Sequence, residues 1–192
     1  RSMASSTRIG RFLYIVLLAV VFSNSSESSA SDLRISVASN FKYTLTKILE
    51  ELEKSSDFSA INTVISSASS GILYAQIING APFDVFLSAD AERPDSLIKK
   101  DLAHASSRLV YARGQLALWS SKSNVALSQA GLNIFGVTGL RYSMANPLHA
   151  PYGRAAKTLM ETNNLWKQPD RNRITAQNIA GVFQYLVSGS VN

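Results

Sequence analysis

The stretch from Ile61 to Asp90 places the strongest constraint on how this chain can fold. It begins with alternating apolar residues, passes through a serine-rich loop, and then carries apolar residues at helical spacing over 72–78. Gly80 and Pro82 end this run, and a short hydrophobic strand follows over 83–87. A strand, a small polar loop, a helix and a second strand in this order predict one βαβ unit. Ligands bind such units at the carboxyl ends of the strands, and here that edge carries serine hydroxyls and backbone N–H groups.

The N-terminal segment has the pattern of a secretory signal peptide. Arg8 and Arg11 precede the apolar run Phe12–Phe22, which is too short to cross a bilayer as an ordinary helix of about 20 residues. A polar run then ends in small residues, which predicts cleavage after Ala30. The alternative, a buried N-terminal helix, is the weaker interpretation. Residues 1 and 2 stand ahead of Met3 and are interpreted as remnants of cloning.

Composition excludes several classes of function. The chain has no cysteine, so thiolate catalysis, disulfides and cysteine metal sites are ruled out, and two histidines make a multi-histidine metal centre improbable. Without residues 1–30 the formal net charge falls from +6 to +4. This mild positive charge lacks a dense Lys/Arg run, so a nucleic-acid partner is not expected.

A second helix start near the N-terminus repeats the arrangement of the βαβ unit. A strand over Arg34–Ala38 leads into Ser39 and Asn40, and apolar residues at helical spacing follow from Phe41. Ser39 or Asn40 is expected to be the N-cap of this helix, as Ser69-Ser70 is for the next. Taken singly, each is more often an ordinary cap. Together, two helix N-termini at successive strand ends can direct N–H donors at one point.

The pattern of the remaining sequence predicts further strands and helices. Strands are expected over 108–112 and 115–119, with a crossing between two lobes at Arg113-Gly114, and then over 140–145 and 173–175. One helix is expected to begin near Pro151 and a last one at Gln177-Asn178. The predicted organisation is a signal peptide over 1–30, an incomplete lobe 1 over 31–112, and lobe 2 over 113–192.

Four segments are recognisable as a set. They are VASNF at 37–41, SSASSGILYAQIINGAPFDVFLSAD at 66–90, MANPLHAPYGRAAK at 144–157, and QNIAGVFQYLVSG at 177–189. In this order and spacing they resemble the family of periplasmic molybdate-binding proteins of ABC importers. The resemblance covers almost everything from Leu33 to the end, and the G-A-P-x-D-V-F-x-S-A-D run is its most specific part.

The resemblance implies an α/β chain with the type II periplasmic-binding-protein fold, in which two α/β lobes enclose a ligand cleft. It implies a monomeric periplasmic protein that captures molybdate or tungstate as a tetrahedral oxyanion and delivers it to an ABC permease. The implied ligand residues are Ser39, Asn40, Ser70, Tyr152 and Ile179. Tyr152 and Ile179 would act mainly through backbone N–H groups, and the choice between Ser39 and Asn40 stays open. No cofactor is implied, and molybdenum is cargo held through its oxygens.

Family members continue beyond the point where this sequence stops, so the last part of lobe 1 is expected to be missing. One alternative is therefore a truncated lobe that binds nothing, and another is a binder of a different oxyanion such as sulfate. A serine hydrolase is disfavoured, because the chain has no G-x-S-x-G elbow. His104 is expected at the surface and His149 in a loop, rather than as general bases.

Uncharged donors suit molybdate for a physical reason. The dianion carries no proton at neutral pH, so every group in its site can be a donor. Phosphate also presents a P–OH group, which needs an acceptor such as a carboxylate. Asp84 and Asp90 are the nearest acids to the serine clusters, and Asp90 is expected to cap a helix over 93–100 instead. Phosphate is therefore predicted to bind poorly.

Overall fold

The structure is a computed structural model that describes residues 32–55, 58, 61–122, 127–137, 139–166 and 170–192. The predicted signal peptide over 1–30 lies outside the described residues. The described part of the chain from Asp32 onward clusters as one compact unit. The division into lobes at 112 and 113 stays a prediction.

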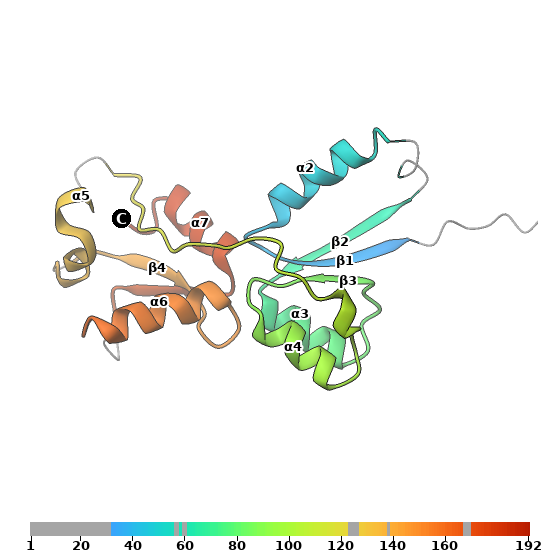
Figure 1. Cartoon of the computed structure of the whole chain (residues 1–192). Coiled ribbons are helices and arrows are strands. Elements are labelled where there is room, and N and C mark those ends of the chain that lie inside the picture. Colours follow the sequence, from blue (N-terminus) through green and yellow to red (C-terminus); the bar gives the residue numbers. More distant parts are fainter. Residues whose placement is uncertain (1–31, 56–57, 59–60, 123–126, 138, 167–169) are drawn as a thin grey trace, which may run out of the picture. The chain divides into compact units, whose positions relative to one another are not determined.

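The first sheet has three parallel strands in the order β2-β1-β3 (Figure 1). They are β1 Leu33–Ala38, β2 Thr63–Ala68 and β3 Val85–Leu87. The connecting helices are α2 Lys42–Leu52 and α3 Ser70–Ile78, and α4 Glu92–Lys99 follows β3. The predicted βαβ unit is therefore β2-α3-β3. Because all three strands are parallel, the loops that follow them meet at one edge of the sheet.

The core of this part lies between the central strand and α2. Ile35 and Val37 of β1 pack against Leu45 and Leu49 of α2, and all four are buried. On α3, Leu73 is 1% exposed, and this helix contacts both β1 and β2. A central parallel strand covered by helices is buried on both faces, which fits the burial of β1 from Ile35 to Ala38.

The second sheet has two parallel strands, β4 Tyr142–Ala145 and β5 Arg173–Ala176. Helix α6 Pro151–Thr162 connects them, and α7 Ile179–Val187 follows β5 and contacts both strands. Between the sheets, the described residues include the short helical turns η1 Ala105–Ser107, α5 Leu127–Ala130 and η2 Gly131–Gly136. Gly153 lets α6 approach β4, because a Cβ atom there would lie 2.3 Å from the carbonyl oxygen of Ala145.

The strands predicted over 108–112 and 115–119 are wrong. Both stretches are described, and they run as irregular chain without strand structure (Figure 1). Leu109 and Trp119 are 70% and 56% exposed. An alternating apolar pattern makes a strand only when a neighbouring edge supplies hydrogen-bond partners, and among the described residues these stretches pair with no strand.

The N-cap predicted for the first helix is also wrong. Residues 39–41 form a turn, closed by a hydrogen bond of 2.9 Å from the Phe41 N–H to the Ala38 carbonyl. Phe41 is then the N-cap of α2 and makes no side-chain cap bond. The turn moves the helix start onward and leaves Ser39 and Asn40 in the loop.

In the described part of the chain, no helix is long and apolar enough to cross a membrane.

Candidate functional site

One pocket lies where loops after all five strands come together. Its lining residues are Ala38, Ser39, Asn40, Ser69, Ser70, Ala89, Ala150, Pro151, Tyr152, Asn178 and Ile179. The structure thus brings together Ser39, Asn40, Ser70, Tyr152 and Ile179, the five residues that the resemblance implies as ligands. None of the lining residues carries a carboxylate or a basic group. Among the described residues no cluster of three or more His, Asp or Glu side chains could hold a metal ion.

Ser70 is held at the pocket by a hydrogen bond from the loop after β3. It is the first residue of α3 and its side chain is fully buried. Its Oγ accepts a hydrogen bond of 2.9 Å from the backbone N–H of Ala89, in the loop after β3. A serine hydroxyl has two acceptor sites and one hydrogen. The bond from Ala89 uses an acceptor site, so the hydroxyl hydrogen is still available for an anion.

Ser69 was predicted as part of a capping pair with Ser70, but it was not among the predicted ligand residues. It is the N-cap of α3, yet its side chain makes no cap bond. The residue is 2% exposed, and its Oγ is a buried polar atom without a hydrogen-bond partner in the described structure. An unsatisfied buried hydroxyl costs about 1–3 kcal/mol, so such atoms are often found where a ligand binds. The serine cluster at 66–70 contained this residue, but only the fold distinguishes it from its neighbours.

The loop after β1 offers its donors unequally. The backbone N–H of Ser39 is already bonded to the Ala68 carbonyl at 3.0 Å, which leaves its hydroxyl as the available donor. Asn40 is exposed at the rim of the pocket. Both residues line the pocket, so both Ser39 and Asn40 stay candidate ligands.

The starts of α6 and α7 supply backbone donors from the second sheet. Pro151 occupies the first turn of α6, and the first intrahelical bond reaches Arg154, so the N–H groups of Tyr152 and Gly153 precede the helical ladder. In α7 the Asn178 side chain caps the Gly181 N–H at 3.1 Å, which leaves the Ile179 N–H ahead of the ladder. These backbone groups carry the partial positive charge of a helix N-terminus.

The segment between the two sheets contacts the pocket lining at Gly114 and neighbouring residues at Tyr111. A Cβ atom at Gly114 would lie 2.1 Å from the hydroxyl of Tyr152, so the tyrosine ring reaches this glycine closely. Tyr111 donates a hydrogen bond of 2.8 Å to the Ser88 carbonyl and packs on Phe41 with ring centroids 4.9 Å apart. Burial, and secondarily the neighbouring Tyr152, raises the pKa of Tyr111.

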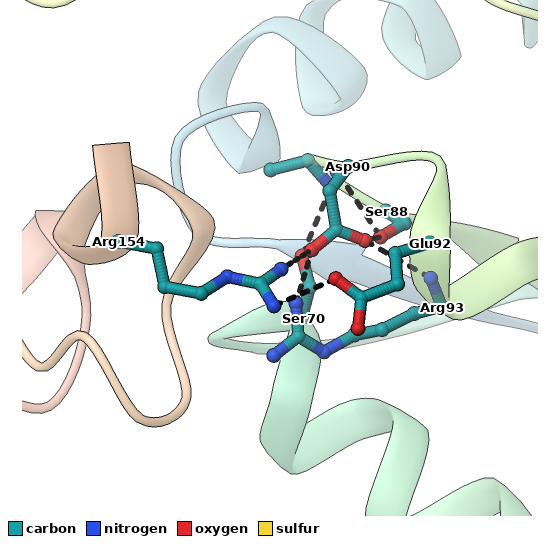
Figure 2. A network of polar contacts seen from close by, with 7 residues as sticks. Ser70, Ser88, Asp90, Glu92, Arg93 and Arg154 are labelled. Carbon is teal, nitrogen blue, oxygen red and sulfur yellow. Dashed lines mark hydrogen bonds and ion pairs between the residues drawn. The ribbon is translucent and has the colours of Figure 1, made fainter. Parts of the chain in front are cut away.

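Charged residues surround the pocket without lining it. Asp90 binds the guanidinium groups of Arg93 and Arg154, and Arg154 also binds Glu92 (Figure 2). Asp90 was predicted to cap α4, but the N-cap of this helix is Ala91, and the Asp90 side chain instead accepts a hydrogen bond of 3.2 Å from the Arg93 N–H in the first turn. Asp84 accepts from the Arg34 N–H and is exposed at the opposite end of β3. Neither carboxylate considered for phosphate binding lines the pocket.

Neither histidine is placed for catalysis at this pocket. His104 and His149 are both exposed and absent from its lining. His149 contributes a backbone carbonyl, which accepts a hydrogen bond of 2.9 Å from the Gly71 N–H. The arrangement as a whole can bind an anion by hydrogen bonds from uncharged groups.

The chain is similar in sequence to known binding proteins. The molybdate-binding protein ModA of Azotobacter vinelandii is 34% identical over 166 residues, which is 85% of this chain and 63% of the relative. ModA of Rhodobacter capsulatus is 36% identical over 123 residues, 63% of this chain and 47% of the relative. This chain therefore spans less than two thirds of the length of these curated relatives.

The fold agrees as well. The solved periplasmic molybdate-binding protein of Azotobacter vinelandii superposes with a TM-score of 0.76 at 33% identity, covering 83% of this chain and 68% of that one. The predicted α/β fold with parallel sheets is confirmed by this likeness. The family described as bacterial extracellular solute-binding protein matches residues 33–192. With its strand-end pocket and this match, the chain belongs to the bacterial extracellular solute-binding protein family.

Proposed function

We propose that this chain captures molybdate, or tungstate, as a tetrahedral oxyanion and delivers it to an ABC permease. The observation that carries the proposal is the convergence of uncharged donors from both sheets on one pocket, with the unpartnered Ser69 hydroxyl among them. The names of the relatives supply the ligand, since both are molybdate-binding proteins.

The chemistry of the donors fits this ligand class. Molybdate and tungstate carry two negative charges and no proton, so they need donors only. Ser39, Ser69 and Ser70 offer hydroxyls, and Tyr152 and Ile179 offer backbone N–H groups at helix starts. Helix N-termini stabilise an anion without a counter-charge that must itself be desolvated.

Titration calorimetry with molybdate, tungstate, sulfate and phosphate tests the proposal. Molybdate and tungstate are expected to bind, and phosphate is expected to bind poorly because Asp84 and Asp90 lie outside the pocket lining. A ligand at a hundred times its Kd stabilises a folded protein by about 2.7 kcal/mol, so molybdate should also raise the melting temperature. Equal competition by phosphate would contradict the proposed donor-only site.

Location and partner belong to the same proposal. The relative with a solved structure is periplasmic, which supports a periplasmic location and a permease partner for this chain. The signal peptide over residues 1–30 and the absence of a resident cofactor are also part of the proposal. Expression in a Gram-negative host, followed by fractionation and N-terminal sequencing, should recover protein that begins at Ser31 in the periplasmic fraction.

The proposed role is binding and not catalysis. We take this chain to be a binding protein, since the named relatives are binding proteins and neither histidine lines the pocket. Ester hydrolysis that is lost in His149→Ala would contradict this view. Sulfate binding in place of molybdate would support the alternative ligand, and no melting shift with any oxyanion in a folded sample would support a chain that does not bind.

A further inference from the structure

Arg154 joins the two sides of the pocket from just outside its lining. Its Nη2 lies 2.5 Å from Asp90 Oδ2, and its Nη1 lies 2.7 Å from Glu92 Oε2 (Figure 2). Asp90 directly follows Ala89 of the lining, and Arg154 stands two residues after Tyr152. The guanidinium therefore connects α6 to the loop between β3 and α4.

This connection can open without leaving a buried charge unpaired. The Asp90 side chain is 15% exposed and is bound on its own side by the Arg93 guanidinium and the Ser88 hydroxyl. The Arg154 side chain is 37% exposed, so it can be hydrated when released. Removing one partner of a buried ion pair is strongly destabilising when the other is left alone. Here Asp90 keeps Arg93, and the contact to Arg154 can break and re-form.

The loop that Arg154 holds also positions a predicted ligand residue. Asp90 follows Ala89, whose N–H donates the 2.9 Å hydrogen bond to Ser70 Oγ. A displacement of Asp90 therefore moves the group that fixes the Ser70 hydroxyl. Hydrogen bonds weaken steeply as their distance and angle depart from the normal range, so small movements of this loop change the donor set.

We propose that Arg154 is a positioning residue of the oxyanion pocket, clasping α6 to the Asp90 loop and slowing the escape of the ligand. The inference rests on the proposed oxyanion-binding function. The anion would accept hydrogen bonds from both sheets, and the clasp joins α6 of one sheet to the Asp90 loop of the other. Both favour the arrangement in which these parts lie together, so the free energies of anion binding and of clasp formation are coupled. The clasp consists of the contacts of Arg154 with Asp90 and Glu92.

A rival role for Arg154 is a bare positive charge that attracts anions. Two substitutions separate the roles. Arg154→Gln removes both the charge and the clasp. Asp90→Asn keeps the Arg154 charge but removes the negative partner, while the remaining side-chain oxygen can still cap the Arg93 N–H. A bare charge predicts tighter binding in Asp90→Asn, and a clasp predicts faster escape.

The measurement is the dissociation of isotopically labelled molybdate during a chase with excess unlabelled molybdate. We expect Arg154→Gln and Asp90→Asn each to dissociate roughly tenfold faster than the wild-type chain, as for truncated interfacial ion pairs. The control is Lys157→Gln, which removes one positive charge from the same helix, where Lys157 pairs with Glu161 at 3.5 Å. Its dissociation rate should match the wild type.

Salt provides a second readout that a general loss of stability would not give. Added sodium chloride should speed dissociation from the wild-type chain, because a partly exposed ion pair is screened, and should have little effect on Arg154→Gln. Should Asp90→Asn fail to fold, Glu92→Gln serves instead, because its side chain is 71% exposed. The clasp is wrong if Arg154→Gln behaves like Lys157→Gln, or if the variants at 90 or 92 bind molybdate more tightly.

A ligand-free measurement keeps this inference separate from the proposed function. The chain has no cysteine, so Lys99→Cys on α4 and Thr162→Cys on α6 would give the only two sites for spin labels. Without ligand, Arg154→Gln should broaden the distance distribution between the labels, and Lys157→Gln should not. An unchanged distribution overturns the clasp. If Arg154→Gln broadens the distribution but the chain with native Arg154 binds no molybdate or tungstate, the proposed function alone is overturned.

Discussion

The backbone N–H of Gly71 donates a hydrogen bond of 2.9 Å to the carbonyl oxygen of His149. Gly71 lies in the first turn of α3, and His149 precedes α6, so this bond joins two of the helix starts that line the pocket. A Cβ atom at Gly71 would lie 2.6 Å from that oxygen and 2.9 Å from an Arg93 nitrogen. The close approach requires a residue without a side chain.

Gly71→Ala should therefore push the loop before α6 away from α3. Because backbone atoms cannot rotate aside as a flexible side chain can, we expect molybdate affinity to fall by about tenfold or more, as for a misplaced binding group. Calorimetry measures the loss. Gly136→Ala is the matched control, since a Cβ atom there meets nothing within 4 Å. Equal affinities for the two variants would show that the contact does not set the pocket.

Ser69→Ala should affect binding and stability differently. The Oγ has no partner in the described structure, so its removal should leave the unliganded protein equally stable or slightly more so. Molybdate binding should weaken by about tenfold, since a hydrogen bond to a charged ligand contributes about 1.5–3 kcal/mol.

Ser70→Ala is the comparison for this prediction, because it also removes the acceptor of the Ala89 N–H. It should lower the free energy of unfolding of the unliganded protein by about 1 kcal/mol. Urea unfolding and calorimetry on both variants give the two quantities. A loss of stability in Ser69→Ala as large as in Ser70→Ala would assign Ser69 a structural role only.

Tyr142 should make stability fall at alkaline pH. Burial, together with a hydrogen bond of 2.5 Å to Asp170, raises the pKa of Tyr142 above its usual value of about 10. As pH rises past about 10, the unfolded chain loses this proton first, so the free energy of unfolding decreases. The contribution is complete below pH 10 and disappears as pH approaches the folded-state pKa.

Unfolding of the wild type and Tyr142→Phe between pH 8 and 11 checks this linkage. The variant should show a shallower decline, because phenylalanine has no proton to lose. Tyr43→Phe, at a side chain that is 75% exposed, is the control and should follow the wild type. Parallel curves for wild type and Tyr142→Phe would contradict the prediction.

Leu73→Ala should be the costly substitution in the first part of the chain. Leu73 is 1% exposed on α3, and a buried leucine replaced by alanine costs about 2–5 kcal/mol through lost burial and a residual cavity. Leu102→Ala, at a residue that is 50% exposed, should change stability by no more than about 0.5 kcal/mol. Urea unfolding measures both, and similar values would mean that α3 is not part of the core.

The sequence predicted the features that local pattern controls. The order β2-α3-β3, the start of α6 at Pro151 and the start of α7 after Asn178 follow from apolar spacing and from proline and asparagine preferences at helix starts. Because parallel strands point the same way, polar pairs after successive strands predicted donors that can meet at one point, and Ser39 and Ser70 line one pocket. The full set of ligand residues came only from the resemblance.

The features that were missed depend on residues far apart in the chain. The stretches at 108–112 and 115–119 alternate like strands, but a strand also needs an edge to pair with, and no local pattern supplies it. Ser69 differs from its neighbouring serines only through its burial without a partner. Arg154 and Asp90 stand 64 residues apart, so only the fold reveals their contact.

The charges around the pocket imply a constraint on how this lineage can change. Asp90 and Glu92 balance Arg93 and Arg154 beside a lining of uncharged groups. Drift that removed Arg154 alone would leave surplus negative charge next to a pocket that is proposed to bind an anion. Substitutions at 154 and at 90 or 92 should therefore have been fixed together, and homologous genes that lack one member of this quartet should show the compensating loss.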